Sequence, residues 1–66
     1  MKLTVRVERH RGYLSAMVVE PRIRGRELLG RKHIAKLELA KPIIERLLLP
    51  RYPGCTIEYS LGEGVQ

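Results

Sequence analysis

The sequence contains no aspartate, tryptophan or phenylalanine, and Cys55 is its single cysteine. One cysteine excludes an internal disulfide, and the chain has neither a Cys-x-x-Cys pair nor the Cys/His grouping of a zinc site. The two histidines, His10 and His33, lie far apart in the sequence, and no carboxylate cluster accompanies either one. We therefore expect no metal and no cofactor.

Long apolar runs are also missing. The opening MKLTVRVERH carries charge throughout, unlike the apolar core of a signal peptide, and no run approaches the roughly 18 residues of a membrane span. A single unpaired thiol fits a reducing compartment. We expect a cytoplasmic protein with no membrane partner.

Groups for catalysis are scarce. Ser15 and Ser60 are the only serines, and no aspartate is present to orient a base, so a serine or cysteine triad is hard to assemble. Cys55 follows Gly54 at the start of a predicted strand, where we interpret it as a small core residue. General acid and base work by glutamate and histidine would require a concave pocket. We expect that the protein is not an enzyme.

Positive charge is abundant. Lys and Arg together number 13 against 7 Asp and Glu, which gives a net charge of +6, and nine of the cations are arginines. Residues 6–32 hold eight basic and three acidic residues, whereas one arginine faces two glutamates from Pro50 onward. Arginine's planar fork suits phosphate and carboxylate. The composition therefore predicts an anionic partner for the first half of the chain.

A chain of 66 residues predicts a single small basic domain over 1–66. A domain of this size buries only about 60% of the surface that its unfolded chain exposes, so its stability is marginal. Because no disulfide or metal can support it, we expect a homodimer.

Two strands are predicted in the first third. KLTVRVE (2–8) alternates strictly between apolar and polar residues, and YLSAMVVE (13–20) follows a turn at Gly12. Both faces of 13–20 have apolar character, which indicates a central strand or one whose second face meets a partner. Pro21 ends this strand or places it at an edge of the sheet.

The later half predicts a strand, a helix and a strand. HIAKLELA (33–40) alternates Ala35, Leu37 and Leu39 with charged residues, which favours a strand over a helix. Pro42 suits the first turn of a helix over 42–49, with one apolar face formed by Ile43, Ile44, Leu47 and Leu48. CTIEYSL (55–61) is typical of a last strand. The predicted fold is α+β: a small, mostly antiparallel sheet in the order β-β-loop-β-α-β with one short helix packed on one face.

The stretch RIRGRELLGRKH (22–33) is predicted to be a long loop, since Gly25 and Gly30 each disfavour a helix by about 1 kcal/mol. GRELLG lacks the Gly-Lys-Ser/Thr ending of a phosphate-binding loop. Alternate arginines in an extended ribbon would share one face, and such a ribbon can enter a major groove or follow phosphates. With only three tyrosines as aromatic rings, a single-strand stacking platform is not expected. The candidate nucleic-acid-binding residues are Arg22, Arg24, Arg26, Arg31, Lys32 and His33, with Arg9 and Arg11 and with help from Arg6.

The sequence thus favours a non-enzymatic, basic nucleic-acid-binding accessory or regulatory protein that contacts phosphates through this arginine-rich loop. The alternative is a small protein-binding regulator or inhibitor, of the phage or plasmid type, that caps an acidic or enzyme surface. Leu28 and Leu29 favour the alternative, because they lie in a charged loop where no core requires them.

The opening strand, the turn and GYLSAMVVEP resemble the start of HicB-type antitoxin domains, which share a strand–turn–Gly-Tyr opening. The resemblance covers about a quarter of the chain. The following PRIRGRELLGRKH departs from that pattern, so the sequence assigns no family.

Overall fold

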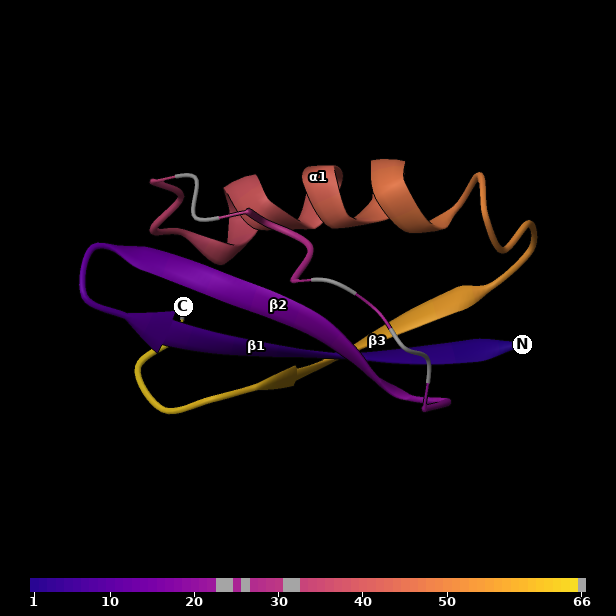
Figure 1. Ribbon diagram of the computed structural model, residues 1–66, viewed down its shortest axis with the longest axis horizontal. Helices are drawn as coiled ribbons and strands as arrows, with labels where there is room; N and C mark the ends of the chain where they lie inside the picture. Colours follow the sequence, from indigo (N-terminus) through magenta and orange to yellow (C-terminus); the bar gives the residue numbers. More distant parts are fainter. Residues whose placement is uncertain (23–24, 26, 31–32, 66) are drawn as a thin grey trace.

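Three strands and one helix form in the part of the chain that the structure describes. The computed structural model describes residues 1–22, 25, 27–30 and 33–65. Its elements are β1 (Lys2–His10), β2 (Tyr13–Glu20), α1 (Leu37–Leu48) and β3 (Thr56–Leu61), and the strands lie in the order β2-β1-β3. Helix α1 lies across one face of the sheet (Figure 1). The α+β class with one helix on one face is confirmed, in the element order β-β-α-β.

The hairpin of β1 and β2 follows the alternation of the sequence. Leu3, Val5 and Val7 of β1 are completely buried beneath α1. The antiparallel register runs from Val5 opposite Val18 to His10 opposite Tyr13, and Gly12 has a φ of 83°, which suits glycine in a tight turn. Strand β2 lies at an edge, so its interpretation as a central strand is wrong.

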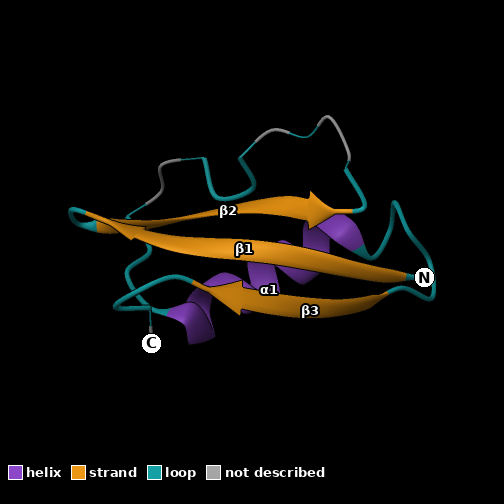
Figure 2. Ribbon diagram, turned by 90° about the horizontal axis from the view of Figure 1, so that it is seen from below, coloured by secondary structure: helices purple, strands orange, loops and turns teal. Residues whose placement is uncertain are grey.

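The sheet is mixed, which corrects the prediction of a mostly antiparallel sheet. Strand β1 is antiparallel to β2 but parallel to β3, in a register from Lys2 opposite Thr56 to Val7 opposite Leu61. Figure 2 shows β1 between the other two strands, with α1 behind the sheet. The predicted last strand (55–61) is confirmed apart from its first residue. A parallel partner for β1 requires a crossover connection, which α1 provides.

The strand predicted over 33–40 is wrong, because the chain enters α1 at Leu37. Residues buried against the sheet recur as Leu37, Ala40, Ile44 and Leu48, a helical spacing that continues through Pro42. Pro42 lies inside the helix and is exposed to solvent. Leu47 is 45% exposed and lies largely outside the core, contrary to the predicted apolar face.

Before α1 begins, Ile34 lies at the hairpin end of the sheet, beside Leu14. In the described part of residues 22–33 no helix or strand forms, as predicted for this loop. Two backbone hydrogen bonds fasten the segment between β2 and α1 to the outer edge of β2: the N–H of Leu14 donates to the carbonyl of Ile34 at 2.8 Å, and the N–H of Leu28 donates to that of Ala16 at 2.7 Å. The Glu20–Pro21 peptide bond is cis.

The face of the sheet opposite α1 has no helix over it in the described residues (Figure 2). Met17 and Val19 lie on this face, 46% and 43% exposed. Among the same residues, no helix is long and apolar enough to cross a membrane.

Candidate nucleic-acid interface

The structure describes some of the predicted basic residues and not others. Arg9, Arg11, Arg22 and His33 are exposed to solvent. The remaining candidates of the loop lie outside the described residues: Arg24, Arg26, Arg31 and Lys32.

The edge of β2 determines where the described cations lie. The bond between Leu14 and Ile34 holds His33 at the hairpin end of β2, where Arg9 and Arg11 also lie. Arg22 follows Glu20 and therefore lies beyond the opposite end of the strand. Because a strand rises about 3.3 Å per residue, β2 spans roughly 25 Å. The structure therefore places His33 at the same end of β2 as the hairpin arginines and Arg22 beyond the opposite end.

Glu27 fastens the loop to the sheet. Its Oε1 accepts hydrogen bonds from the backbone N–H groups of Ala16 and Leu29, both at 2.8 Å, and its Oε2 accepts one from the N–H of Gly30. Charge-assisted hydrogen bonds of this kind are stronger than neutral ones. The only acidic residue between 22 and 33 is thus engaged by the backbone, and sequence reasoning did not assign it this role.

The two leucines after Glu27 belong to the protein's interior. Leu29 is 1% exposed and lies in the core, and Leu28 is partly buried against it. The interpretation of Leu28 and Leu29 as an exposed protein anchor is therefore wrong. They seat the loop on the sheet, because burial of apolar side chains stabilises the contact at about 25 cal/mol per Å².

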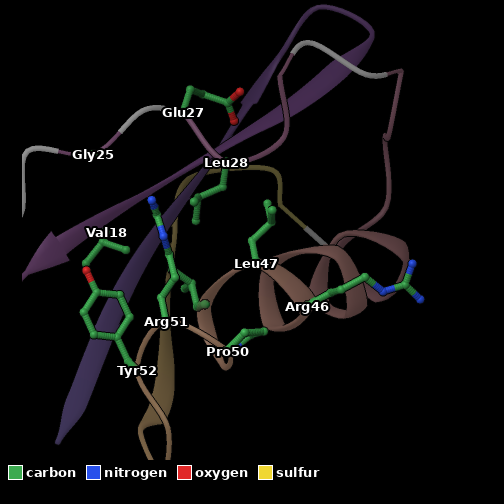
Figure 3. Close-up of a pocket in the computed structure, with 10 residues that line it drawn as sticks. Val18, Gly25, Glu27, Leu28, Arg46, Leu47, Pro50, Arg51 and Tyr52 are labelled. Atoms are coloured by element: carbon green, nitrogen blue, oxygen red, sulfur yellow. The ribbon is translucent and has the colours of Figure 1, made fainter.

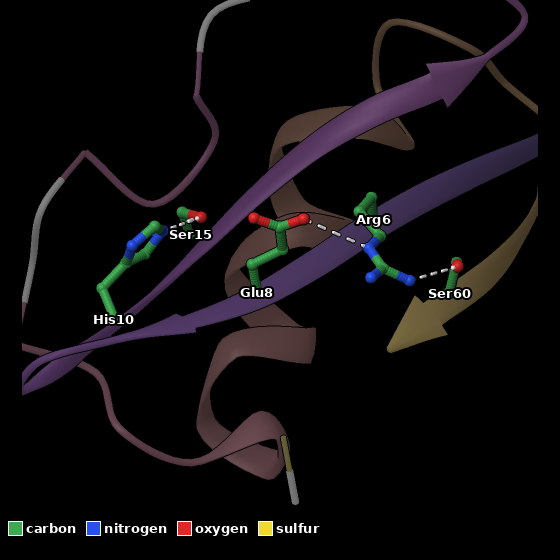
Figure 4. A network of polar contacts seen from close by, with 5 residues as sticks. All are labelled: Arg6, Glu8, His10, Ser15 and Ser60. Carbon is green, nitrogen blue, oxygen red and sulfur yellow. Dashed lines mark hydrogen bonds and ion pairs between the residues drawn. The ribbon is translucent and has the colours of Figure 1, made fainter. Parts of the chain in front are cut away.

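Two ion pairs lie on the uncovered face of the sheet. Arg6 donates from Nε to Glu8 at 3.4 Å and from Nη1 to the Ser60 hydroxyl at 3.1 Å (Figure 4). Lys2 Nζ lies 3.2 Å from a carboxylate oxygen of Glu58. Arg6, which the sequence suggested as an accessory contact, therefore has an acidic partner within the chain.

The hairpin carries a second group of polar contacts. The rings of His10 and Tyr13 stack with centroids 4.9 Å apart, and His10 Nε2 lies 2.7 Å from the Ser15 hydroxyl (Figure 4). Arg9 donates from Nη1 to the carbonyl of Gly64 at 3.2 Å. These contacts order the hairpin while Arg9 keeps its charge exposed.

Seven other described cations lie beyond ion-pair distance of every described carboxylate. They are Arg9, Arg11, Arg22, Lys36, Lys41, Arg46 and Arg51. Unpaired guanidinium groups on a surface are available to phosphate.

A groove of about 740 Å³ separates the loop from the C-terminal half of α1. Arg46 and Arg51 line it together with Glu27, and apolar side chains such as Leu47 and Tyr52 form other parts of its wall (Figure 3). Sequence reasoning missed both arginines, because they lie in the half of the chain with little net charge. Their nearness to the loop depends on the packing of α1.

The residues that could perform chemistry do not assemble into a catalytic or metal site in the described structure. No group of three or more potential metal ligands occurs there. The hydroxyl of Ser15 contacts His10, but the nearby Glu8 carboxylate is bonded to Arg6 (Figure 4). Cys55 is a free, partly buried thiol packed against the core, which agrees with its interpretation as a core residue.

Among the titratable groups of the described residues, only Tyr59 has a clearly shifted pKa. Burial raises the pKa of its phenol above the ordinary value, and the negative charge of Glu45 raises it further. Lys41 Nζ lies 5.0 Å from the centroid of the Tyr59 ring, and the buried Tyr59 hydroxyl has no hydrogen-bond partner among the described residues. This residue lies on β3, away from the predicted basic surface.

Comparison of the chain with models of protein families, with curated proteins and with solved structures gave no match. A fold class alone hosts many functions, so the chemistry of the surface is what indicates the function.

Proposed function

We propose that the protein binds nucleic acid through its phosphates, as a non-enzymatic accessory or regulatory protein. The contact surface is the hairpin end with Arg9, Arg11 and His33, continued along the 22–33 loop to Arg22. The observation that carries the proposal is the bonding of Glu27, whose two carboxylate oxygens receive three backbone N–H groups. The single acidic residue within 22–33 therefore serves the fold.

The acids on the uncovered face support the same proposal. Glu8 pairs with Arg6 and Glu58 pairs with Lys2, which leaves the hairpin arginines without an acidic partner in the described chain. Duplex DNA carries one negative charge per about 1.7 Å of its axis. A basic surface along the roughly 25 Å of β2 can therefore contact several successive phosphates without reading bases.

The groove arginines extend this surface. Arg51 and Arg46 line the groove together with Gly25 and Glu27, and Figure 3 shows the guanidinium of Arg46 directed away from the loop. A nucleic acid that follows the loop would pass beside Arg51. We include Arg51 among the contacts because Figure 3 shows its guanidinium directed toward the loop.

The test is a fluorescence-anisotropy titration with duplex DNA, single-stranded DNA and RNA of equal length at two salt concentrations. Salt-sensitive binding to at least one of them is expected. Arg11→Gln, Arg22→Gln and Arg51→Gln are compared with Lys41→Gln, which removes one charge on the side of Tyr59. Absence of binding to all three nucleic acids would overturn the proposal. An equal loss in all four variants would overturn the assigned surface.

A protein-binding function is the second candidate, and the exposed Met17 and Val19 on the uncovered face favour it. In that function the protein caps an acidic or enzyme surface. Polyglutamate of matched length in the same anisotropy assay distinguishes the two functions. Tighter binding to polyglutamate than to every nucleic acid would favour the protein-binding function.

A further inference from the structure

Strand β3 presents an unpaired backbone edge. The N–H of Thr56 donates to the carbonyl of Met1 at 2.9 Å, and the N–H of Gly62 donates to that of Val7 at 2.8 Å. Because backbone groups alternate in direction along a strand, the even-numbered residues of β3 face β1. The N–H and C=O groups of Ile57, Tyr59 and Leu61 therefore point away from the sheet. Outside the ladder between β1 and β3, these three residues form no backbone hydrogen bond among the described residues.

The other edge of the sheet is already occupied. The outward groups of Leu14 and Ala16 on β2 bond to Ile34, Leu28 and Glu27. The outward backbone groups of strand β3 have no such partner in the described chain, and Figure 2 shows β3 as the outermost strand of the sheet on its side. Proteins commonly protect an edge with lysine, proline or a bulge. TIEYSL contains neither residue, and its register with β1 runs without interruption.

We propose that two copies of this chain associate through antiparallel pairing of β3 with β3, in the register that places Tyr59 opposite Tyr59 of the second copy. The two sheets then continue into one sheet, related by a two-fold axis at Tyr59. Every outward N–H of Ile57, Tyr59 and Leu61 finds a carbonyl in this register. The interface is isologous, as is usual in dimers of identical chains.

The side chains of β3 are complementary in this register. Leu61, which is 43% exposed, lies opposite Ile57 of the second copy, and cross-strand apolar pairs of this kind stabilise a sheet. Glu58 lies opposite Ser60 of the second copy. If the two-fold axis lay at Glu58 instead of Tyr59, Glu58 would lie opposite Glu58 of the second copy, where like charges repel. Charge therefore favours the Tyr59 register.

The helix above β3 does not oppose the association. Lys41 and Glu45 lie near Tyr59, the first over its ring and the second close enough to act on its hydroxyl. A two-fold axis at Tyr59 brings this cation and anion toward their copies, so that opposite charges can meet. A domain of 66 residues also gains most from association, because its own core is small.

Hydrogen exchange of the full-length protein tests the proposal residue by residue. In the dimer, the amides of Ile57, Tyr59 and Leu61 are protected together with those of Glu58 and Ser60, and their protection falls on dilution. In a monomer, only the alternate amides that face β1 are protected. Sedimentation measured at the same concentrations gives the oligomeric state.

The variant Leu61→Pro tests the backbone pairing between the two β3 strands, because it removes an outward N–H without breaking a hydrogen bond to β1. Two hydrogen bonds are lost across the two-fold axis, which weakens dimerisation by about tenfold or more. Leu61→Ala keeps the N–H and separates the backbone effect from the loss of the side chain. Circular dichroism establishes that each variant is folded.

The outcomes are distinguishable. A dimer that loses protection at Ile57, Tyr59 and Leu61 on dilution, and that Leu61→Pro weakens more than Leu61→Ala, supports the proposal. A monomer at all concentrations overturns it, as does an unaffected dimer in which these three amides exchange freely. None of these results depends on whether the protein binds nucleic acid.

Discussion

The carboxylate of Glu27 accepts a hydrogen bond from the backbone N–H of Ala16 at 2.8 Å, which joins the basic loop to the edge of β2. In this bond the Glu27 side chain supplies the hydrogen-bond acceptor that a neighbouring strand would otherwise supply at the edge of β2. The same carboxylate orders the turn at Leu29 and Gly30. The position of the candidate interface therefore depends on one acidic residue within a basic segment.

Glu27→Ala is expected to lower the free energy of unfolding by about 1–3 kcal/mol, because backbone N–H groups near the core lose their acceptor. Glu27→Gln retains one carbonyl oxygen and should lose less. Urea denaturation measures both, with the exposed Glu20→Ala as the matched control. A Glu27→Ala midpoint equal to that of Glu20→Ala would show that the contacts of Glu27 contribute nothing to stability.

Ile44→Ala is expected to cost about 2–5 kcal/mol, since Ile44 is completely buried between α1 and the sheet. Leu47→Ala removes a side chain that is 45% exposed and should cost clearly less. Thermal melts of the two variants compare them directly. The reverse order would mean that α1 is rotated about its axis relative to this structure.

Alkaline pH should destabilise the protein through Tyr59. Burial raises the pKa of this phenol in the folded state above that in the unfolded chain, which is about 10. The neutral phenol therefore contributes its full stability at pH values below the unfolded pKa. That contribution is lost as the pH rises through the folded pKa. Phenolate absorbance of the parent and of Tyr59→Phe, at one protein concentration, identifies the Tyr59 titration. Glu45→Gln should move it toward lower pH, and an unchanged titration would exclude the charge effect.

Tyr59→Phe itself should leave stability near neutral pH unchanged or slightly higher. The buried hydroxyl lacks a hydrogen-bond partner among the described residues, so its removal relieves a desolvation cost without breaking a bond. Urea denaturation at neutral pH is the measurement. A marked loss of stability would reveal a hydrogen bond to Tyr59 that these contacts do not include.

Salt dependence should identify which arginines contact phosphate. Each phosphate contact removed makes the negative slope of log K against log salt less steep by about 0.9 for duplex DNA. Arg11→Gln and Arg22→Gln should each show this change, whereas Lys41→Gln should leave the slope of the parent almost unaltered. Equal slopes in all three variants would contradict the proposed contacts at Arg11 and Arg22.

The sequence by itself determined the hairpin, the last strand and the presence of one helix. Strict alternation in KLTVRVE is a local property, because adjacent side chains of a strand point to opposite faces. The free surface of Arg9 and Arg11 was also predictable, since charged residues at a hairpin tip are seldom buried. Four of the proposed contacts, Arg24, Arg26, Arg31 and Lys32, lie outside the described residues, and their role stays a prediction.

Only the tertiary structure decided where α1 begins, how β3 pairs and what the loop leucines do. Leu37 and Ala40 fit both a strand and a helix locally, and burial against the sheet selects the helix because it joins them to Ile44 and Leu48 in one stripe. Parallel pairing of β1 with β3 depends on the path of the crossover, which no local pattern encodes. Leu29 is buried because Glu27 holds the loop on β2, a contact between distant parts of the chain. Local periodicity specifies elements, whereas long-range burial and hydrogen bonding specify their boundaries and partners.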